Sequence, residues 1–264
     1  MLDLDSPITL VGLAEFEAHA SLVGLELPEA VSKARHLLDV SEREKTTASR
    51  PVFGMTDKQL RDYITERSIA THQGYSGSTR GLESGVAEVQ QQILVELRTE
   101  IAPHLDEMVT QLQPEFDRIV EPIVRGAQTY GFAMSMTSDD VIDMADETAS
   151  ATWRESKAAW SAVRPIAKFR QVLSKTFAVS PTLDDLERQA LIGARVGSAV
   201  DMSVAFAAGN NWHTDGTYYV DNRIGGAIDW FAVAAGGLHL NTPTEVDEKL
   251  RSREAALARD LGDL

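Results

Sequence analysis

The sequence contains no cysteine. A disulfide framework, a thiolate zinc site and a cysteine nucleophile are therefore excluded. The sequence also lacks a Walker A loop, an HExxH zinc motif, a GxSxG nucleophile elbow and a GxGxxG dinucleotide loop. It thus presents no obvious nucleophile–base pair and predicts no cofactor. These absences favour a function other than catalysis.

Positive charge is also scarce. The chain has 25 lysines and arginines against 40 aspartates and glutamates, which gives a net charge of −15. Such a chain repels nucleic acid phosphates and anionic membrane surfaces unless its basic residues are segregated, and no long basic run is present. We therefore expect protein partners, including other copies of the chain, and no nucleic acid.

Long apolar runs are missing as well. No stretch of 18 uninterrupted apolar residues occurs, so no membrane span is expected. The first residues carry Asp3 and Asp5, where a secretory signal would carry lysine or arginine. We expect a soluble protein that is cytoplasmic or incorporated in a virion-like assembly.

Helical periodicity dominates what is present. Apolar residues recur every three or four positions over most of the chain, which predicts a mainly α fold, a multi-helix bundle. Polar or Gly/Ser-rich joints at 41–54 and 74–81 divide it. We expect an N-terminal helical segment (1–50), a linker with a short helix (51–81) and a main helical body (82–264). Further helices are expected over 138–177, 180–209, 223–240 and 242–264.

The stretch 82–129 has the longest regular pattern. Its apolar residues repeat every 11 positions, as in Leu97, Met108 and Ile119. This pattern predicts a long helix with one apolar stripe, which three prolines (Pro103, Pro114 and Pro122) should kink or divide. The stripe is a candidate contact surface between helices or between protein partners.

A second long helix is predicted over 138–177. Acidic residues crowd its start and basic residues its end, which matches the helix dipole. Trp153 and Trp160 lie seven positions apart on one face, so they should form a core or a partner-facing seam.

The stretch GNNWHTDGTYY (209–219) breaks the helical pattern. Asp215–Gly216 is a favoured two-residue turn, which predicts a small β-hairpin near residues 210–221. Its register pairs Trp212 with Tyr219 and His213 with Tyr218. The aromatic side chains Trp212, Tyr218 and Tyr219 are therefore candidate contacts for a partner.

The same stretch allows a metal-dependent enzyme as an alternative. The pair His213 and Asp215 resembles the His-x-Asp motif of iron/2-oxoglutarate dioxygenases, and the resemblance implies two ligands of a facial triad completed by a distant histidine. Those enzymes carry the motif on a double-stranded β-helix. Here 49 mostly helix-forming residues follow Asp215, and the only downstream histidine is His239, in an Ala/Gly-rich stretch.

The pattern as a whole favours a structural or assembly protein that acts through helix-mediated oligomerisation or partner binding. Its general character would suit a component of a phage or prophage particle. A second alternative is a lipid-surface binder, because proline-punctuated 11-residue repeats resemble those of exchangeable lipid-binding proteins. The acidic polar face counts against this alternative.

Overall fold

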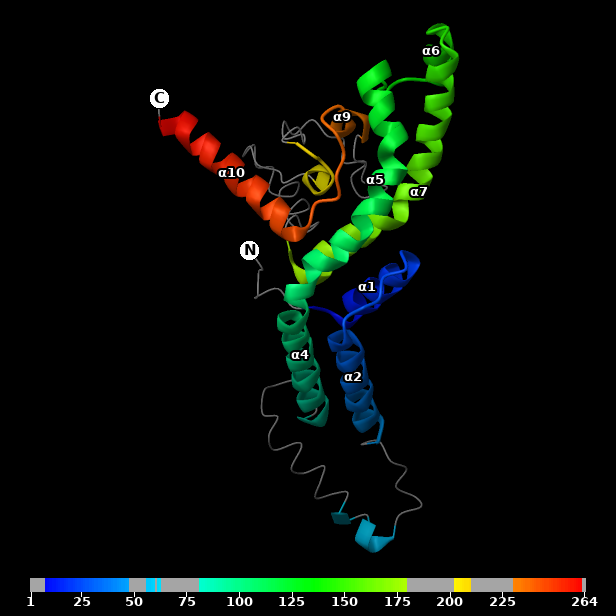
Figure 1. The fold of residues 1–264 in the computed structure, drawn as a ribbon. Helices are drawn as coiled ribbons and strands as arrows, with labels where there is room; N and C mark the ends of the chain where they lie inside the picture. Colours follow the sequence, from blue (N-terminus) through cyan, green and yellow to red (C-terminus); the bar gives the residue numbers. More distant parts are fainter. Residues whose placement is uncertain are drawn as a thin grey trace. The chain divides into compact units, whose positions relative to one another are not determined.

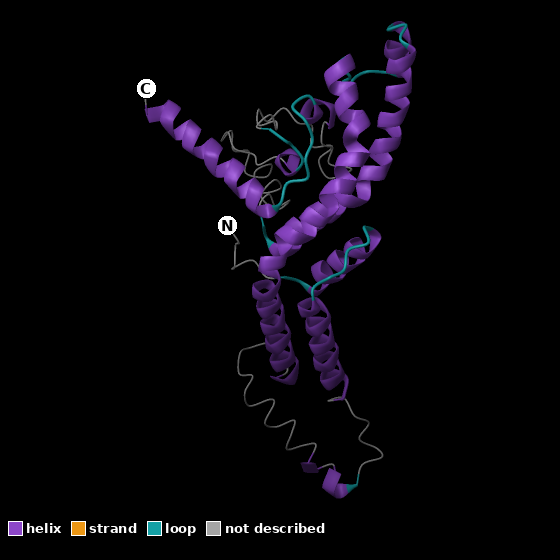
Figure 2. Ribbon diagram, in the orientation of Figure 1, coloured by secondary structure: helices purple, strands orange, loops and turns teal. Residues whose placement is uncertain are grey.

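The computed structural model describes residues 8–47, 56–59, 61–62, 81–179, 202–209 and 230–262. Most of these residues lie in α-helices, and no strand occurs among them (Figures 1 and 2). The predicted fold class, mainly α, is therefore confirmed. The hairpin predicted near 210–221 lies outside the described residues.

The chain divides into two compact units. Unit 1 comprises residues 1–6, 10–26 and 103–264, and unit 2 comprises residues 7–9 and 27–102. This division differs from the sequence-based boundaries at residues 50 and 81. The reason is long-range packing: the first helix packs against α7 (Glu147–Phe177), whereas the second packs against α4 (Gly81–Ile101).

Unit 2 is built on a pair of antiparallel helices, α2 (Glu29–Thr47) and α4. Near the start of α4, Gln90 donates its amide protons to Ser41 Oγ and Glu42 Oε2 near the end of α2, each at 3.1 Å. The buried apolar residues of the pair are Val31, Ala34, Leu38, Leu94 and Leu97. They recur at three- and four-residue steps, so each helix buries one stripe against the other.

The predicted start of the linker, at residue 41, is too early, because the helix before it continues to Thr47. Residues 41–47 continue α2, because Ser41 lies on the buried stripe and its hydroxyl donates to Leu38 O at 2.7 Å. Further along, Thr56 caps the start of a helical segment as predicted. Its backbone N–H donates to Gln59 Oε1 at 2.9 Å, and Gln59 N–H donates back to Thr56 Oγ1 at 3.4 Å.

The stripe predicted over 82–129 is largely buried, and the chain is divided as expected at its first proline. Helix α4 ends at Ile101, a 3₁₀ turn covers Ala102–His104, and α5 runs over Leu105–Tyr130 with Pro114 and Pro122 inside it. Eight members of the 11-residue repeat are at most 6% exposed: Leu94, Leu97, Ile101, Leu105, Met108, Leu112, Phe116 and Ile123. Val89, which the same pattern places on the stripe, is 50% exposed.

In unit 1, α5 lies beside α7, and α1 (Leu10–Leu22) packs on α7 (Figure 1). The ring of Phe16 on α1 lies 4.9 Å from the ring of Phe177 and 5.8 Å from that of Phe169. Gly24 follows α1 in the left-handed region at φ 70°, a conformation that glycine adopts readily after a helix. The expected start at Ser6 and Pro7 lies outside the described part of the chain.

The helix predicted over 138–177 is in fact two helices, α6 (Ser138–Asp143) and α7. Thr137 and Asp140 form a capping box at the start of α6, and Ala145 then adopts φ 54°. Asp146 restarts the helix by accepting from Thr148 N at 2.7 Å and Ala149 N at 3.1 Å. The acidic run therefore contains two helix starts rather than one, because each aspartate cap competes with helix continuation.

Helices are predicted over 180–209 and 223–240, and the structure describes residues 202–209 and 230–240 of these stretches. Neither predicted helix continues to its expected C-terminal end. Only a 3₁₀ turn (Met202–Ala205) and a short helix, α9 (Trp230–Ala234), are helical there. Residues 205–208 and 237–241 instead pair with each other, with an isolated antiparallel bridge between Ala207 and Leu238. Gly237, at φ 92°, allows the turn out of α9.

The C-terminal helix, α10 (Pro243–Gly262), agrees with the prediction over 242–264. Thr242 caps it: Glu245 N–H donates to Thr242 Oγ1 at 3.2 Å, and Thr242 N–H donates to Glu245 Oε2 at 2.8 Å. Within the described ranges, none of the helices has the length and apolar character to cross a membrane.

Candidate functional site

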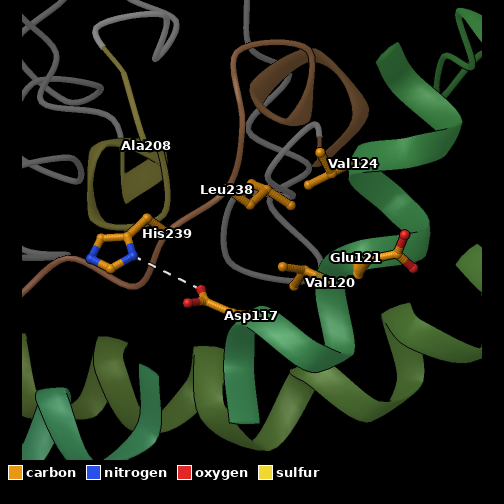
Figure 3. Close-up of a pocket in the computed structure, with 7 residues that line it drawn as sticks. All are labelled: Asp117, Val120, Glu121, Val124, Ala208, Leu238 and His239. Carbon is orange, nitrogen blue, oxygen red and sulfur yellow. Dashed lines mark ion pairs between the residues drawn. The ribbon is translucent and has the colours of Figure 1, made fainter. Parts of the chain in front are cut away.

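A pocket of about 380 Å³ opens on unit 1 beside α5 (Figure 3). One face of α5 contributes Asp117, Val120, Glu121 and Val124, which follow the helical spacing of three and four. The paired segments contribute Ala208, Leu238 and His239 from the opposite side. The pocket therefore has apolar walls and a polar edge where His239 faces Asp117.

Backbone hydrogen bonds hold the paired segments in place. Ala208 N–H donates to Gly237 O at 3.0 Å, His239 N–H to Phe206 O at 2.9 Å, and Asn241 N–H to Ala205 O at 2.8 Å. The side-chain amide of Asn241 donates to Val204 O at 2.9 Å and Ala207 O at 2.7 Å. The position of His239 thus follows from a short two-segment ladder and one buried asparagine.

The contacts of His239 fix its tautomer. Gln113 Nε2 lies 3.0 Å from Leu240 O and 3.2 Å from His239 Nε2. A backbone carbonyl only accepts, so the Gln113 side-chain atom that faces Leu240 O is the amide nitrogen. That nitrogen only donates, and it also faces His239 Nε2. His239 Nε2 is therefore an acceptor, and the neutral ring carries its proton on Nδ1, which lies 3.9 Å from Asp117 Oδ1.

This arrangement positions the segment rather than preparing a proton transfer. A histidine base needs a free lone pair within reach of a substrate, and Gln113 already occupies that of Nε2. Glu245 Oε1 lies 3.9 Å from the same nitrogen. The described residues contain no group of three histidine, cysteine or carboxylate side chains that could hold a metal ion.

A buried arginine on α7 binds the segment that contains His239 by a hydrogen bond to the backbone at residue 241. Arg170 on α7 has no exposed surface, and its Nε donates to Asn241 O at 3.1 Å, while Nη1 donates to Ser174 Oγ. Burial lowers the pKa of Arg170 to about 10, and the nearby carboxylates of Asp106, Asp247 and Glu245 oppose this shift. The charge is thus held by hydrogen bonds inside unit 1 and fastens residue 241 to α7.

Lys249 on α10 completes the support. Its ammonium donates to Ala207 O and Ala208 O, with a distance of 3.1 Å to the latter. Burial lowers the pKa of Lys249, and the charge of Glu245 opposes the shift. Arg170 and Lys249 therefore both donate to backbone carbonyls of the paired segments and of Asn241.

The sequence signals for these residues were weak. His239 follows an Ala/Gly-rich stretch that was predicted as a helix, so the backbone pairing of its segment with residues 205–208 was not predicted. Arg170 does carry a signal, because it occupies an apolar position of α7 between Val163 and Phe177 at heptad spacing. A charged residue on such a stripe indicates a buried polar contact.

Five of the residues singled out from the sequence lie outside the described residues: Trp212, Tyr218, Tyr219 and the weak metal candidates His213 and Asp215. Their roles as partner contacts or metal ligands stay predictions.

Trp153 and Trp160 belong to an internal aromatic cluster of unit 1. Trp153 is 5% exposed and stacks on Phe231 at 5.7 Å, with 10° between the rings, and Trp160 meets Phe231 edge-on at 5.1 Å. Phe132 lies 5.1 Å from Trp153. Trp153 is therefore part of the core, and Trp160, which is partly buried, packs against it.

The stripe residues that were candidate partner contacts are also buried or partly buried. Leu97 is 3% exposed and Met108 is 2% exposed, whereas Ile119 is partly buried. The α5 part of the stripe packs inside unit 1, where α7 and α9 contact α5, so it is not a free surface for lipid.

Large apolar side chains are exposed on α1, where Leu10, Val11 and Leu22 are 42%, 77% and 69% exposed, and on two further surfaces. The first, here called the hairpin face, comprises Leu37 and Val40 on α2 and Val89 and Val95 on α4, which are 40% to 51% exposed. Val89 and Val95 are six positions apart, so they lie on opposite sides of the buried stripe of α4. The second, here called the tip surface, comprises Met134, Ile142 and Met144 around α6, which are 46%, 65% and 38% exposed. Exposed apolar groups of this kind mark candidate interaction sites.

Comparison with known proteins adds no assignment: no protein-family model, curated protein or solved structure matches the chain. The candidate sites are therefore argued from this chain alone.

Proposed function

We propose that the protein is a non-enzymatic assembly protein that associates with copies of itself through the hairpin face of unit 2. The observation that carries the proposal is the exposure of Leu37, Val40, Val89 and Val95 on one helix pair. A pair of helices has a single layer of core, so apolar groups outside that layer stay in water unless another chain covers them.

The distribution of charge favours unit 2 as the self-association surface. Residues 27–102 contain 11 acidic and 10 basic residues, so unit 2 carries a net charge of −1 out of −15. Two copies meeting through unit 2 therefore bring little like charge together. Contact through unit 1, which carries the remaining negative charge, would be repulsive.

The expected association is weak and depends on concentration. One interface covers Val89 or Val95 but not both, which leaves three exposed side chains for each copy. Covering a half-exposed valine or leucine contributes roughly 1 kcal/mol, so three on each of two copies contribute about 6 kcal/mol. The loss of translational and rotational freedom costs about 4–15 kcal/mol. A component of a phage or prophage particle, present at high local concentration, is one setting that fits this range, and the proposal extends to it on general character.

The test is the mass in solution, measured by size-exclusion chromatography with light scattering over a roughly hundredfold range of concentration. The double variant Leu37→Gln/Val40→Gln should shift the mass toward the 28.8 kDa monomer. The matched control is Leu10→Gln/Val11→Gln on α1, which removes a leucine and a valine that are 42% and 77% exposed from unit 1. The control should associate like the wild type.

Two outcomes would refute the proposal. One is a wild-type chain that stays monomeric at every concentration. The other is an oligomer whose mass is unchanged in the hairpin-face variant or is lost equally in the control. Circular dichroism should show that both variants keep wild-type helix content, because all four side chains are exposed.

A further inference from the structure

The tip surface sits on a segment whose backbone is firmly fastened. At the end of α5, Gly131 adopts φ 65°, and Phe132 N–H donates to Gly126 O at 3.1 Å. The capping box of Thr137 and the cap of Asp146 fix the two helix starts that follow. The segment between α5 and α7 thus has defined turns at both ends of α6 (Figure 1).

Inward positions of this segment are already filled. Phe132 is 4% exposed and Val141 is 2% exposed, and both belong to the core cluster of unit 1. Ile142, the next residue, points the other way and is 65% exposed. The apolar groups of the tip surface are therefore held outward by the packing of their neighbours.

Negative charge predominates in the segment that carries these apolar groups, and one cation from α7 contacts it: Lys157 Nζ donates to Ser138 Oγ at 3.2 Å. Residues 131–147 contain five carboxylates and no lysine, arginine or histidine. The carboxylates belong to Asp139, Asp140, Asp143, Asp146 and Glu147. Hydrogen bonds from Thr137 lower the pKa of Asp140, which keeps that group charged at neutral pH.

We propose that the tip surface docks a basic amphipathic helix of a partner protein. Leucine or similar side chains of that helix would cover Met134, Ile142 and Met144, while its lysines or arginines would meet the surrounding carboxylates. Methionine side chains are unbranched and flexible, so they fit partner side chains of different shapes.

The charge pattern separates this partner from the other occupants. A second copy that used the same surface would place five carboxylates against five, which is unfavourable. An anionic membrane is repelled for the same reason. The proposal is independent of the self-assembly proposed above, because it concerns other residues in the other unit.

The test uses the full chain and a fluorescent synthetic helix with leucine on one face and lysine on the other. Anisotropy titration of wild-type protein should give saturable binding. The double variant Ile142→Gln/Met144→Gln should raise Kd at least about tenfold. The control Leu10→Gln/Val11→Gln should leave Kd unchanged, since it removes exposed apolar groups elsewhere in unit 1.

Two companion measurements separate the contributions. Asp139→Asn/Asp143→Asn should weaken binding and flatten its dependence on salt, because two of the attracting charges are lost. A lysine/serine peptide without apolar groups should bind more weakly than the leucine/lysine peptide, and equal binding would show non-specific attraction and overturn the proposal.

Three further results would also overturn it. The first is an equal Kd for wild type and the Ile142→Gln/Met144→Gln variant. The second is a change in oligomer mass caused by that variant, which would assign the surface to a second copy. The third is co-sedimentation with phosphatidylcholine vesicles that the same variant abolishes, which would assign the surface to lipid.

Discussion

Replacing Gly126 by alanine sets two known effects against each other at the contact of α5 with α7. Alanine in a helix interior is ordinarily more favourable than glycine by about 1 kcal/mol. Here an added Cβ would lie 2.6 Å from Cδ2 of Phe132 and 3.3 Å from Ser156 Oγ. Carbon atoms normally approach to about 3.5 Å, and forcing an extra methyl into a packed core costs roughly 1–3 kcal/mol.

Steric repulsion should win, because Phe132 is itself buried and fastened. Its ring contacts Trp153 at 5.1 Å and Phe231 at 5.8 Å, which leaves it little room to move away. We expect Gly126→Ala to destabilise unit 1 by about 1 kcal/mol net. A change of this size lowers Tm by about 2–4 °C.

A double-mutant cycle measures the cause. Phe132→Val removes the δ and ε carbons, so the alanine gains space and its helix preference should appear as a gain of about 1 kcal/mol in that background. Urea unfolding followed by tryptophan fluorescence is suitable, because the tryptophans among the described residues, Trp153, Trp160 and Trp230, lie in unit 1. Equal effects of Gly126→Ala in both backgrounds, or a stabilising effect in the wild type, would refute the reasoning.

Three further predictions concern unit 1. Phe231→Ala removes a ring that is 1% exposed and should cost about 3–5 kcal/mol in urea unfolding; a loss below about 1 kcal/mol would mean that the cluster is not tightly packed. Asp146→Ala removes the α7 cap and should lower the free energy of unfolding by about 1 kcal/mol, measured by thermal unfolding. The control Asp143→Ala, at an exposed position, should lower it by no more than about 0.5 kcal/mol. Equal losses in the two variants would contradict the capping role. Arg170→Met leaves the buried carbonyl of Asn241 without this donor and should cost about 2 kcal/mol, whereas a neutral result would show that the arginine is dispensable.

The helical architecture follows from local sequence signals. The 11-residue repeat identified positions that are buried in α4 and α5, since a regular stripe is buried whenever any partner covers it. The caps at Thr56 and Thr242 were readable for a similar reason: a capping residue and its partner lie within one turn.

The prediction of one helix over 138–177 was wrong because two capping signals stand close together. Thr137 with Asp140 and Asp146 with Thr148 each favour a helix start, and the sequence does not show that the chain turns between them. The packing of Phe132 and Val141 into the core determines that turn.

The pocket was decided by tertiary structure. Residues 237–240 belong to a stretch that was predicted as a helix, yet they pair with 205–208, because the side chains of Asn241 and Arg170 supply hydrogen bonds to backbone carbonyls there. The sequence by itself determined that the fold is mainly α and which stripe α4 and α5 bury, since those signals repeat within a few residues. Only the tertiary structure decided which helices share a core, which apolar side chains stay exposed and where His239 lies, because these depend on contacts between residues far apart in the chain.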